Sequence, residues 1–434
     1  MANLVSPIKG FKDLVSGVQE SRHNLEEWQF IGRWQFVERI ARELLPTYRY
    51  GEIRTPVLER TELFSRGIGE NTDIVGKEMF SFTARGEREV TMRPENTAGV
   101  VRSYVEHKLY TLPGPQKFWY LGPMFRNENV QAGRYRQFHQ LGVECFGSDD
   151  PRVDAEIIVL ATDLLARLGL TGLEVQLNSV GCSECRPAYR EALQGFLRQH
   201  QEALCENCVT RTEKNPLRVL DCKVETCGPV IRQAPPLSDY LCEACRNHQA
   251  GVIRYVESVK LPYVLNPRLV RGLDYYTRTV FEVVSGALGA QNTVLAGGRY
   301  NGLVEELGGP STPAVGWGLG MERLIMLLSK SLVPEEYLDA LFMPTTDDAE
   351  LVAFQLAHQM REAGLRVEVA SPGKLGNLFK QAERLRARFG VILGEDELAA
   401  KSATVKNLEK REQATVPQLE LAGWLKQTQT GELV

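Results

Sequence analysis

Residues 122–147, GPMFRNENVQAGRYRQFHQLGVECFG, contain two apolar segments separated by a polar loop. Aromatic and aliphatic residues in 118–126 and 137–146 predict two strands. Gly133, within the loop, favours a turn between them. The sequence therefore predicts a β-hairpin with a long turn rich in arginine.

Several polar side chains of this hairpin are expected to lie side by side. Because side chains alternate along a strand, Phe138, Gln140 and Glu144 are expected on one face. Arg126 and Glu128 are expected on one face of the partner strand. The resulting surface would present guanidinium, carboxylate and amide groups together. Such a surface suits a small zwitterion beside a phosphate better than it suits a hydrophobic core.

Two further stretches carry a resemblance to a known family. Residues 271–282 read RGLDYYTRTVFE, and residues 314–328 read AVGWGLGMERLIMLL. Together with the hairpin, which resembles the second signature of class II aminoacyl-tRNA synthetases, they are similar to the motifs of histidyl-tRNA synthetases. The resemblance extends from Lys9 to about Val416. It implies an α+β class II catalytic core, with a mostly antiparallel sheet flanked by helices, a helical insertion and a C-terminal α/β anticodon-binding domain.

The composition is that of an ordinary globular protein, with 43% hydrophobic and 24% charged residues. The chain has neither an apolar run of the roughly 20 residues that a membrane helix needs nor an amino-terminal signal pattern. A cytoplasmic location is therefore expected. The formal net charge of −4 does not indicate a nucleic-acid partner. Lys and Arg outnumber acids within 371–411, but a solvated helix face explains that excess equally well.

The chain is expected to contain two parts of a catalytic core, an insertion and a further domain. The strand pattern of 50–59, interrupted by Pro56, resembles the first family signature, across which the resemblance implies a homodimer. Strands and helices alternate after a linker expected near Pro334, which predicts an α/β domain. The expected boundaries are 1–180 for the first part of the core, 181–262 for a helical, cysteine-rich insertion, 263–331 for the second part of the core, and 332–434 for the anticodon-binding domain.

A nucleotide site has to be built from side chains, since the sequence has no GxxxxGK[ST] loop and no convincing GxGxxG after a strand. Arg126 can bind a phosphate through two hydrogen bonds. Arg323 can stack on a base or reach a phosphate, although tight strand–helix packing would also explain a surface Arg there. Alternation of Gly316, Gly318 and Gly320 leaves one strand face bare, as a floor for an aromatic base. The resemblance implies binding of ATP, with Mg²⁺ on its β- and γ-phosphates, by Arg126, Glu128, Arg134, Phe138, Gly318, Gly320 and Arg323.

Two carboxylates mark the expected amino-acid site. Buried carboxylates are unfavourable unless they meet cations, and an α-ammonium group and an imidazole N–H are suitable partners. Residues 89–105 are expected to pass from a strand, EVTMRPE, into a helix with Thr97 near its start. Glu95 and Thr97 would share a face only if the strand continued through both of them. A structural ion pair is the alternative for either carboxylate. The resemblance implies histidine binding by Glu95, Thr97, Arg126, Gln140, Glu144, Arg271, Tyr275 and Tyr276.

Arg271 and Arg126 are the expected catalytic residues. When a carboxylate attacks the α-phosphate, negative charge grows on the phosphoryl oxygens, and guanidinium groups on two sides would stabilise it. Arg cannot act as a general base, so catalysis would consist of positioning and electrostatics. The alternative for Arg271 is a structural salt bridge to Asp274.

The strand pattern near these motifs predicts further elements. Residues 270–284 and 293–296 are expected to be strands, and Gly297–Tyr300 a turn. Three residues depart from the usual family pattern: Asn96 and Ala296 stand where Gly is usual, and Asn301 where Asp is usual. These departures concern loop geometry and acceptor-stem contacts more than the chemistry. For the extra 5′ guanylate of the histidine tRNA, the resemblance suggests Gln131 and Arg136.

Eight of the nine cysteines lie within residues 182–245. Their spacing, in a protein expected in the cytoplasm, favours tetrahedral zinc over disulfides. The resemblance argues the other way, because family members generally have no structural zinc. Spacing does not reveal which pairs would share an ion, and Cys145 is expected to be packed. The pairs are Cys182 with Cys185, Cys205 with Cys208, Cys222 with Cys227, and Cys242 with Cys245.

The resemblance implies an aminoacyl-tRNA synthetase that converts histidine and ATP to histidyl-adenylate and transfers the histidyl group to the 3′ end of the histidine tRNA. A histidine-binding regulatory paralogue of an ATP phosphoribosyltransferase is the alternative. Such proteins lack the anticodon domain and lose parts of RGLDYY and of the arginine signatures, whereas this chain keeps them. A zinc-dependent nucleic-acid-binding protein, as a third interpretation, would explain only the cysteines.

Overall fold

The computed structural model describes residues 5–16, 25–69, 72, 74–86, 88–288, 292–329 and 337–429. The chain divides into two compact units, 1–334 and 335–434. The expected linker position, Pro334, lies outside the described residues. No helix in the described ranges combines the length and the apolar character needed to cross a lipid bilayer.

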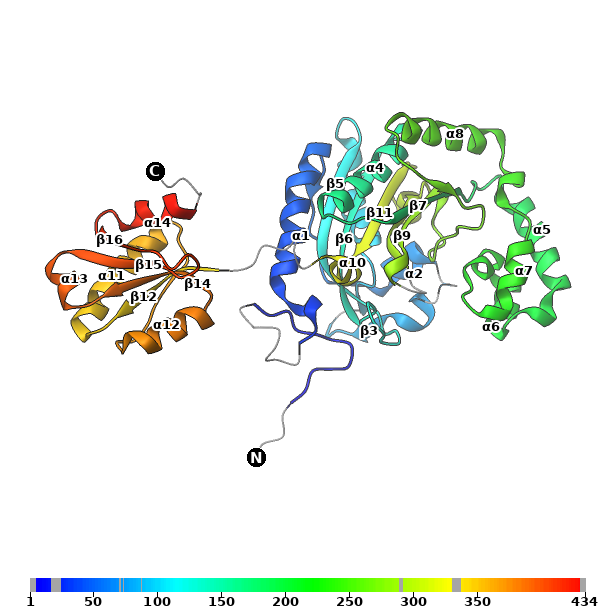
Figure 1. Ribbon diagram of the computed structural model, residues 1–434. Helices are drawn as coiled ribbons and strands as arrows, with labels where there is room; N and C mark the ends of the chain where they lie inside the picture. Colours follow the sequence, from blue (N-terminus) through cyan, green and yellow to red (C-terminus); the bar gives the residue numbers. More distant parts are fainter. Residues whose placement is uncertain are drawn as a thin grey trace. The chain divides into compact units, whose positions relative to one another are not determined.

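An eight-stranded sheet is the centre of the first unit (Figure 1). The strand order is β1-β5-β6-β11-β10-β9-β7-β8, and only the outermost pairs, β1–β5 and β7–β8, are parallel. A second, antiparallel sheet has the order β2-β4-β3. The strands are β1 (Gly51–Glu52), β2 (Leu58–Arg60), β3 (Phe80–Thr83), β4 (Glu89–Met92), β5 (Gln116–Phe125), β6 (Gln137–Phe146), β7 (Leu173–Ser179), β8 (Val264–Leu265), β9 (Thr277–Ser285), β10 (Thr293–Arg299) and β11 (Ala314–Gly320).

The predicted hairpin is confirmed as β5 and β6, which pair from Phe125 with Gln137 to Gln116 with Phe146. Strand β6 is covered on both sides. Val143 and Cys145 pack into the core beneath α1, α4 and α10, whereas Phe146 packs into the core on the other side, with α3 and α9. The alternation predicted from the sequence thus places Glu144 on the face opposite Cys145.

Helices cover the sheet of the first unit. Helix α4 begins where Asp150 Oδ1 accepts a hydrogen bond of 2.8 Å from the Arg152 N–H and where Pro151 occupies the first turn. The helices of this unit are α1 (Ile31–Leu44), α2 (Thr61–Ile68), α3 (Thr97–Glu106), α4 (Pro151–Arg167), α5 (Arg186–Gln199), α6 (Glu206–Lys214), α7 (Gly228–Gln233), α8 (Glu243–Ser258), α9 (Leu303–Glu306) and α10 (Met321–Leu327).

The segment between β7 and β8 is helical, as expected. Figure 1 shows α5, α6 and α7 gathered in one group, while α8 lies along α4. Val252 and Val256 of α8 belong to the same buried cluster as the apolar residues of α4. The last helix of the segment therefore packs against the sheet-bearing part.

The bounds predicted for the strands 270–284 and 293–296 were wrong. Residues 271–276 precede β9 and form no strand, and β10 continues through Gly297, Gly298 and Arg299, where a turn was expected. The reason lies in the pairing of β10 with β11. A Cβ on Gly297 would lie 2.5 Å from the Trp317 Cβ, so glycine allows this close approach inside a strand.

The second unit is an α/β domain, as predicted. Its sheet has the order β13-β12-β14-β15-β16, with β12 parallel to both neighbours and the pairs after β14 antiparallel. Separate apolar clusters, one including α11 and α14 and the other α12, pack against the strands. Its elements are β12 (Leu338–Pro344), α11 (Asp347–Glu362), β13 (Val367–Val369), α12 (Leu375–Arg384), β14 (Ala387–Leu393), α13 (Glu395–Ala399), β15 (Ser402–Asn407), β16 (Gln413–Pro417) and α14 (Leu421–Gln429).

Candidate active site

A pocket of about 410 Å³ in the first unit contains every residue predicted to bind histidine or ATP. Strands β6, β10 and β11, the start of α3 and the segment before β9 contribute to its lining. The predicted residues in it are Glu95, Thr97, Arg126, Glu128, Arg134, Phe138, Gln140, Glu144, Arg271, Tyr275, Tyr276, Gly318, Gly320 and Arg323.

Two buried carboxylates, Glu95 and Glu144, lie in this pocket. Glu95 accepts hydrogen bonds from the backbone N–H groups of Thr97, at 2.6 Å, and Ala98, at 3.0 Å. Glu144 accepts hydrogen bonds from Thr97 Oγ1, at 2.8 Å, and from the Tyr300 hydroxyl. Within the described residues, neither carboxylate forms an ion pair with a Lys, Arg or His side chain.

Burial raises the pKa of both carboxyl groups. For Glu144, desolvation outweighs the hydrogen bonds from Tyr300 and Thr97 and raises the pKa to about 8. For Glu95, desolvation also raises the pKa, against the lowering effect of the bonds from Ala98 and Thr97. A cationic ligand would lower both values, because it favours the charged carboxylate.

The predicted helix start near Thr97 is confirmed, but the strand before it is shorter than expected, so Glu95 and Thr97 share no strand face. Strand β4 ends at Met92, and Thr97 is the first residue of α3. Glu95 and Thr97 still meet because the Glu95 carboxylate caps the N-terminus of α3, where unpaired N–H groups favour an anion.

Arg126 and Glu128 lie beyond the end of β5, so their predicted shared strand face was also wrong. Arg126 Nε donates a hydrogen bond of 2.8 Å to the Pro94 carbonyl, and its guanidinium lies 5.0 Å from the centre of the Phe138 ring. Glu128 forms an ion pair of 3.3 Å with Arg134. The loop nevertheless brings the side chains of Arg126, Glu128 and Arg134 to the pocket, which Phe138 of β6 also lines.

Arg271 forms an ion pair with Glu282 of β9, and not with Asp274. Burial is the largest single effect and opposes the charged guanidinium, but Glu282 together with Tyr276, Asp221 and Tyr275 outweighs it and raises the pKa of Arg271. Arg271 therefore stays cationic, and its buried Nε has no hydrogen-bond partner in the part of the chain that the structure describes. Asp274 instead accepts a hydrogen bond of 2.9 Å from Asn215 of the insertion.

Alternating glycines of β11 form the predicted bare face. Val315, Trp317 and Leu319 are buried in the core, and Gly318 and Gly320 line the pocket. Arg323, in the first turn of α10, donates hydrogen bonds to the carbonyls of Gly133, at 3.2 Å, and Thr293, at 3.1 Å. Gly133 has a positive φ of 70°, and a Cβ there would lie 3.0 Å from Arg323 Cγ. Glycine thus lets the hairpin loop approach Arg323 closely.

Four buried tyrosines surround Glu144. The rings of Tyr275 and Tyr276 are 4.7 Å apart, and that of Tyr275 is 5.5 Å from Tyr300. Tyr120 and Tyr300 were not predicted as site residues, although both line the pocket. Tyr120 follows Trp119 in a strand that reads as a continuous apolar run, so its hydroxyl gave no sequence signal.

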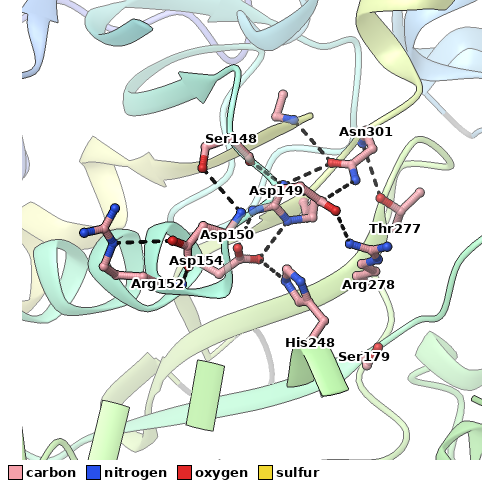
Figure 2. Close-up of polar contacts among 12 residues, drawn as sticks. Ser148, Asp149, Asp150, Arg152, Asp154, Ser179, His248, Thr277, Arg278 and Asn301 are labelled. Atoms are coloured by element: carbon pink, nitrogen blue, oxygen red, sulfur yellow. Dashed lines mark hydrogen bonds and ion pairs between the residues drawn. The ribbon is translucent and has the colours of Figure 1, made fainter. Parts of the chain in front are cut away.

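Arg299, expected in a turn, is instead fully buried in a charged cluster. Figure 2 shows Asp154 beside His248, with Asn301 and Arg278 near Asp149. Arg299 forms an ion pair with Asp154. Burial opposes ionisation of Asp154, but His248 and Arg299 outweigh it and lower the pKa of that carboxyl. The cluster joins β10, α4 and α8.

The residues that depart from the family pattern fit the structure. Asn96 has a negative φ of −116°, and its Oδ1 accepts a hydrogen bond of 2.5 Å from the Thr55 hydroxyl. Ala296 lies within β10, and the Asn301 side chain donates a hydrogen bond of 3.0 Å to Asp149.

The predicted tRNA contacts, Gln131 and Arg136, lie in the hairpin loop and do not line the pocket. Gln131 is exposed and pairs through its backbone with Arg134. Arg136 is partly buried beside Gly10, whose carbonyl accepts a hydrogen bond of 2.9 Å from its N–H.

Two family models match the chain, Histidyl-tRNA synthetase over residues 32–324 and Anticodon binding domain over residues 339–428. The chain belongs to the histidyl-tRNA synthetase family. The resemblance stated from the sequence is thereby confirmed, as are the class II core and the C-terminal domain that it implied.

Individual relatives of known name cover nearly the whole chain. The histidine–tRNA ligase of Halothermothrix orenii is 49% identical over 388 residues, which are 88% of this chain and 93% of the relative. That of Desulforamulus reducens is 48% identical over 400 residues, or 91% and 96% of the two chains. The crystal structure of apo S. aureus histidyl-tRNA synthetase superposes with a TM-score of 0.80 at 34% identity, covering 98% of this chain and 100% of that one.

Proposed function

We propose that this chain is a histidine–tRNA ligase. It activates L-histidine with ATP, releases pyrophosphate, and transfers the histidyl group from the adenylate to the 3′ end of the histidine tRNA. The observation that supports this most directly is the pair of buried carboxylates, Glu95 and Glu144, which have no cationic partner among the described residues and lie in one pocket with Arg126 and Arg271.

Histidine supplies the cations that these carboxylates lack. Its α-ammonium group, and the N–H of its imidazole, are donors that satisfy buried acceptors at low cost. Thr97 and Gln140 add further polar groups on the same side of the pocket. Tyr275 and Tyr276 supply an aromatic wall for the flat side chain. The histidine carboxylate then faces the guanidinium groups.

Arg126 and Arg271 act on the transition state of adenylate formation. The histidine carboxylate oxygen attacks the α-phosphorus, the bond to the bridging oxygen breaks, and pyrophosphate leaves. Negative charge on the α-phosphoryl oxygens is stabilised by cations already held in place, Arg126 by the Pro94 carbonyl and Arg271 by Glu282. No proton transfer by either Arg is needed, since Arg stays protonated.

ATP lies on the bare face of β11 in this proposal. The absence of side chains at Gly318 and Gly320 leaves room for the base, and Arg323 lies at the edge of that floor. The carboxylates of Glu128 and Glu282 also line the pocket, which fits Mg²⁺, an ion that prefers carboxylate and phosphate oxygens. Mg²⁺ bound with the triphosphate would reduce its negative charge.

The tRNA contacts and the assembly complete the proposal. Gln131 and Arg136 of the hairpin loop contact the 5′ end of the tRNA, and the second unit reads the anticodon. We further propose a cytoplasmic homodimer that forms across the segment around Pro56. The catalytic core comprises 1–180 and 263–331, interrupted by the insertion 181–262, and the anticodon-binding domain comprises 332–434.

Charging of purified histidine tRNA with each of the twenty amino acids tests this function. We expect charging with histidine that depends on ATP, and background rates with the other nineteen. Histidine binding without adenylate formation or charging would favour the regulatory paralogue instead. Absence of both histidine binding and charging would reject the proposed function.

A further inference from the structure

The eight cysteines of the insertion gather into two groups of four. The first contains Cys182, Cys185, Cys242 and Cys245, and the second Cys205, Cys208, Cys222 and Cys227. Within each group the four sulfur atoms lie within 4.8 Å of one another, and two are partly exposed while two are buried. The two groups are therefore nested in the sequence. Cys182 and Cys185 share a group with Cys242 and Cys245, and the four cysteines of the second group lie between these two pairs along the chain.

The distances between sulfurs fit a single tetrahedral ion. Cys182 Sγ lies 3.6 Å from Cys185 Sγ and 3.8 Å from Cys242 Sγ, and Cys205 Sγ lies 3.9 Å from Cys222 Sγ. A tetrahedron with Zn–S bonds of about 2.3 Å has edges of about 3.8 Å. A disulfide would need sulfurs about 2.05 Å apart.

Backbone donors around both groups favour thiolates. The N–H of Cys242 donates to Cys185 Sγ at 3.1 Å, and the N–H of Cys205 donates to Cys227 Sγ at 3.2 Å. Each bond runs from the first cysteine of one pair to the second cysteine of the partner pair. Hydrogen bonds donated to a coordinating atom orient that ligand and stabilise its charged form.

We propose that the insertion binds two structural zinc ions, one at each group, and that the second ion holds part of the insertion against the active site. Closed sites with four thiolates and no open position are typical of structural zinc. The first site joins the residues that enter the insertion after β7 to the start of α8, where the chain returns towards the sheet. It therefore fastens the two ends of the α5–α7 group.

The second site links the two ends of a segment that extends to the pocket. Cys205 precedes α6, and Cys222 follows the 3₁₀ turn Pro216–Asp221. Between them, Asn215 donates a hydrogen bond of 2.9 Å to Asp274, and Arg218 Nε lies 3.6 Å from the same carboxylate. This segment thus contacts the motif that carries Arg271.

Cys222 itself is flanked by two residues of the pocket. Asp221 and Lys223 both line the cavity that contains Arg271, and their side chains form an ion pair of 3.1 Å. An ion bound by Cys222 would restrict the backbone that carries them, just as a cross-link restricts a loop. The zinc at this site is therefore a positioning element of the pocket, and this role rests on the proposed function.

Metal analysis of the purified full chain tests the sites without reference to activity. We expect two zinc ions per chain, one in Cys222→Ser, one in Cys242→Ser and two in Cys145→Ala, whose cysteine belongs to neither group. Cobalt substitution should give the visible absorption of tetrahedral thiolate coordination, at half the intensity in either serine variant. Iron in place of zinc, or no metal after reconstitution with zinc, would overturn the proposal.

Kinetics of histidine-dependent ATP–pyrophosphate exchange tests the positioning role. Cys222→Ser should lower kcat/KM by about 10- to 100-fold, since small displacements of active-site groups have effects of that size. Lys223→Ala should lower it while both zinc ions remain bound. Unchanged kinetics in a Cys222→Ser protein that has lost one zinc would overturn the positioning role and leave the metal sites intact. Two zinc ions in a wild-type protein without exchange would instead count against the proposed function alone.

Discussion

Thr97 Oγ1 donates a hydrogen bond of 2.8 Å to Glu144 Oε1, and this bond joins the first residue of α3 to the last part of β6. The same helix end binds Glu95 through two backbone N–H groups. Two carboxylates are thus fixed beside one another before any ligand arrives. Their mutual repulsion and burial favour a bound proton, which a cationic ligand can displace.

The raised pKa of Glu144 predicts an unusual dependence of stability on pH. With a folded pKa of about 8 and an ordinary value of 4.5 when unfolded, the native protein binds a proton in that window that the unfolded chain does not. Stability due to this group is fully present below pH 4.5 and is lost as pH rises towards 8. The slope should reach about 1.4 kcal/mol per pH unit for one group.

Glu144→Gln removes this titration. We expect its thermal midpoint to vary less between pH 5 and 8 than that of the wild type, measured without histidine. Glu95, whose pKa burial also raises, contributes to the variation that persists. Glu62→Gln, on the exposed side of α2, serves as control and should retain the wild-type slope. Equal slopes in Glu144→Gln and the wild type would show that Glu144 is already ionised in the free protein.

Arg271→His should slow adenylate formation strongly while histidine binding changes little. The variant removes a fixed positive charge from the α-phosphate, and loss of one such stabilising group typically costs about 10²- to 10³-fold in rate. Single-turnover formation of histidyl-adenylate measures the effect, with Arg39→His, an exposed residue paired with Glu43 in α1, as the matched control. A near-normal rate in Arg271→His would remove Arg271 from the catalytic step.

The local pattern of apolar and turn residues in the sequence predicted much of the fold. Residues 137–146 were predicted as a strand with the bounds that β6 has, because alternation and flanking turn residues agree there. The glycines of β11 also share one face of a strand, as alternation predicts, and their role as a floor for a base stays a prediction. Gly297 was misread as a turn, since the requirement for glycine comes from Trp317 on the neighbouring strand, which local sequence does not reveal.

The sequence predicted which residues form the site better than it predicted how the chain positions them. Arg126 and Glu128 were expected on a strand face but reach the pocket from a loop, where Arg126 is held by a hydrogen bond to the Pro94 carbonyl. Glu282, the partner of Arg271, stands in the quoted motif but has no local feature that marks its role. Pairing of the cysteines also depends on the folded chain, since the partners of Cys182 and Cys185 lie 57 or more residues away.

Asp154→Asn should destabilise the first unit by about 3–5 kcal/mol, the usual cost of removing one partner of a buried ion pair. Arg299 has no access to solvent and would lose its buried counter-charge, while His248 would lose the carboxylate 3.3 Å from its Nε2. Urea unfolding followed by tryptophan fluorescence measures this, since four of the five tryptophans, all but Trp424, lie in that unit. Asp150→Asn, an exposed position that keeps its capping oxygen, should cost less than about 1 kcal/mol.

The Gly320→Ala variant tests the proposed ATP-binding face of β11 without disturbing the packing of that strand. A Cβ at Gly320 meets no described atom within 4 Å, and the backbone there has an ordinary φ of −80°, so the thermal midpoint should not change. The added methyl group would project from the floor proposed for ATP. Overpacking of that size costs about 1–3 kcal/mol, so the KM for ATP should rise about tenfold or more while the KM for histidine stays within about twofold.

Gly316→Ala, four residues earlier on the same face, is the matched comparison for this prediction. Its Cβ would lie 2.5 Å from the Val143 carbonyl oxygen and 2.8 Å from Glu144 Cδ, so it should lower the thermal midpoint and weaken histidine binding. The two variants therefore differ in which substrate they affect, although both add one methyl group to β11. If Gly320→Ala left the KM for ATP unchanged, the nucleotide would have to bind elsewhere in the pocket, because a methyl group on a surface in contact with a base cannot be accommodated without displacement.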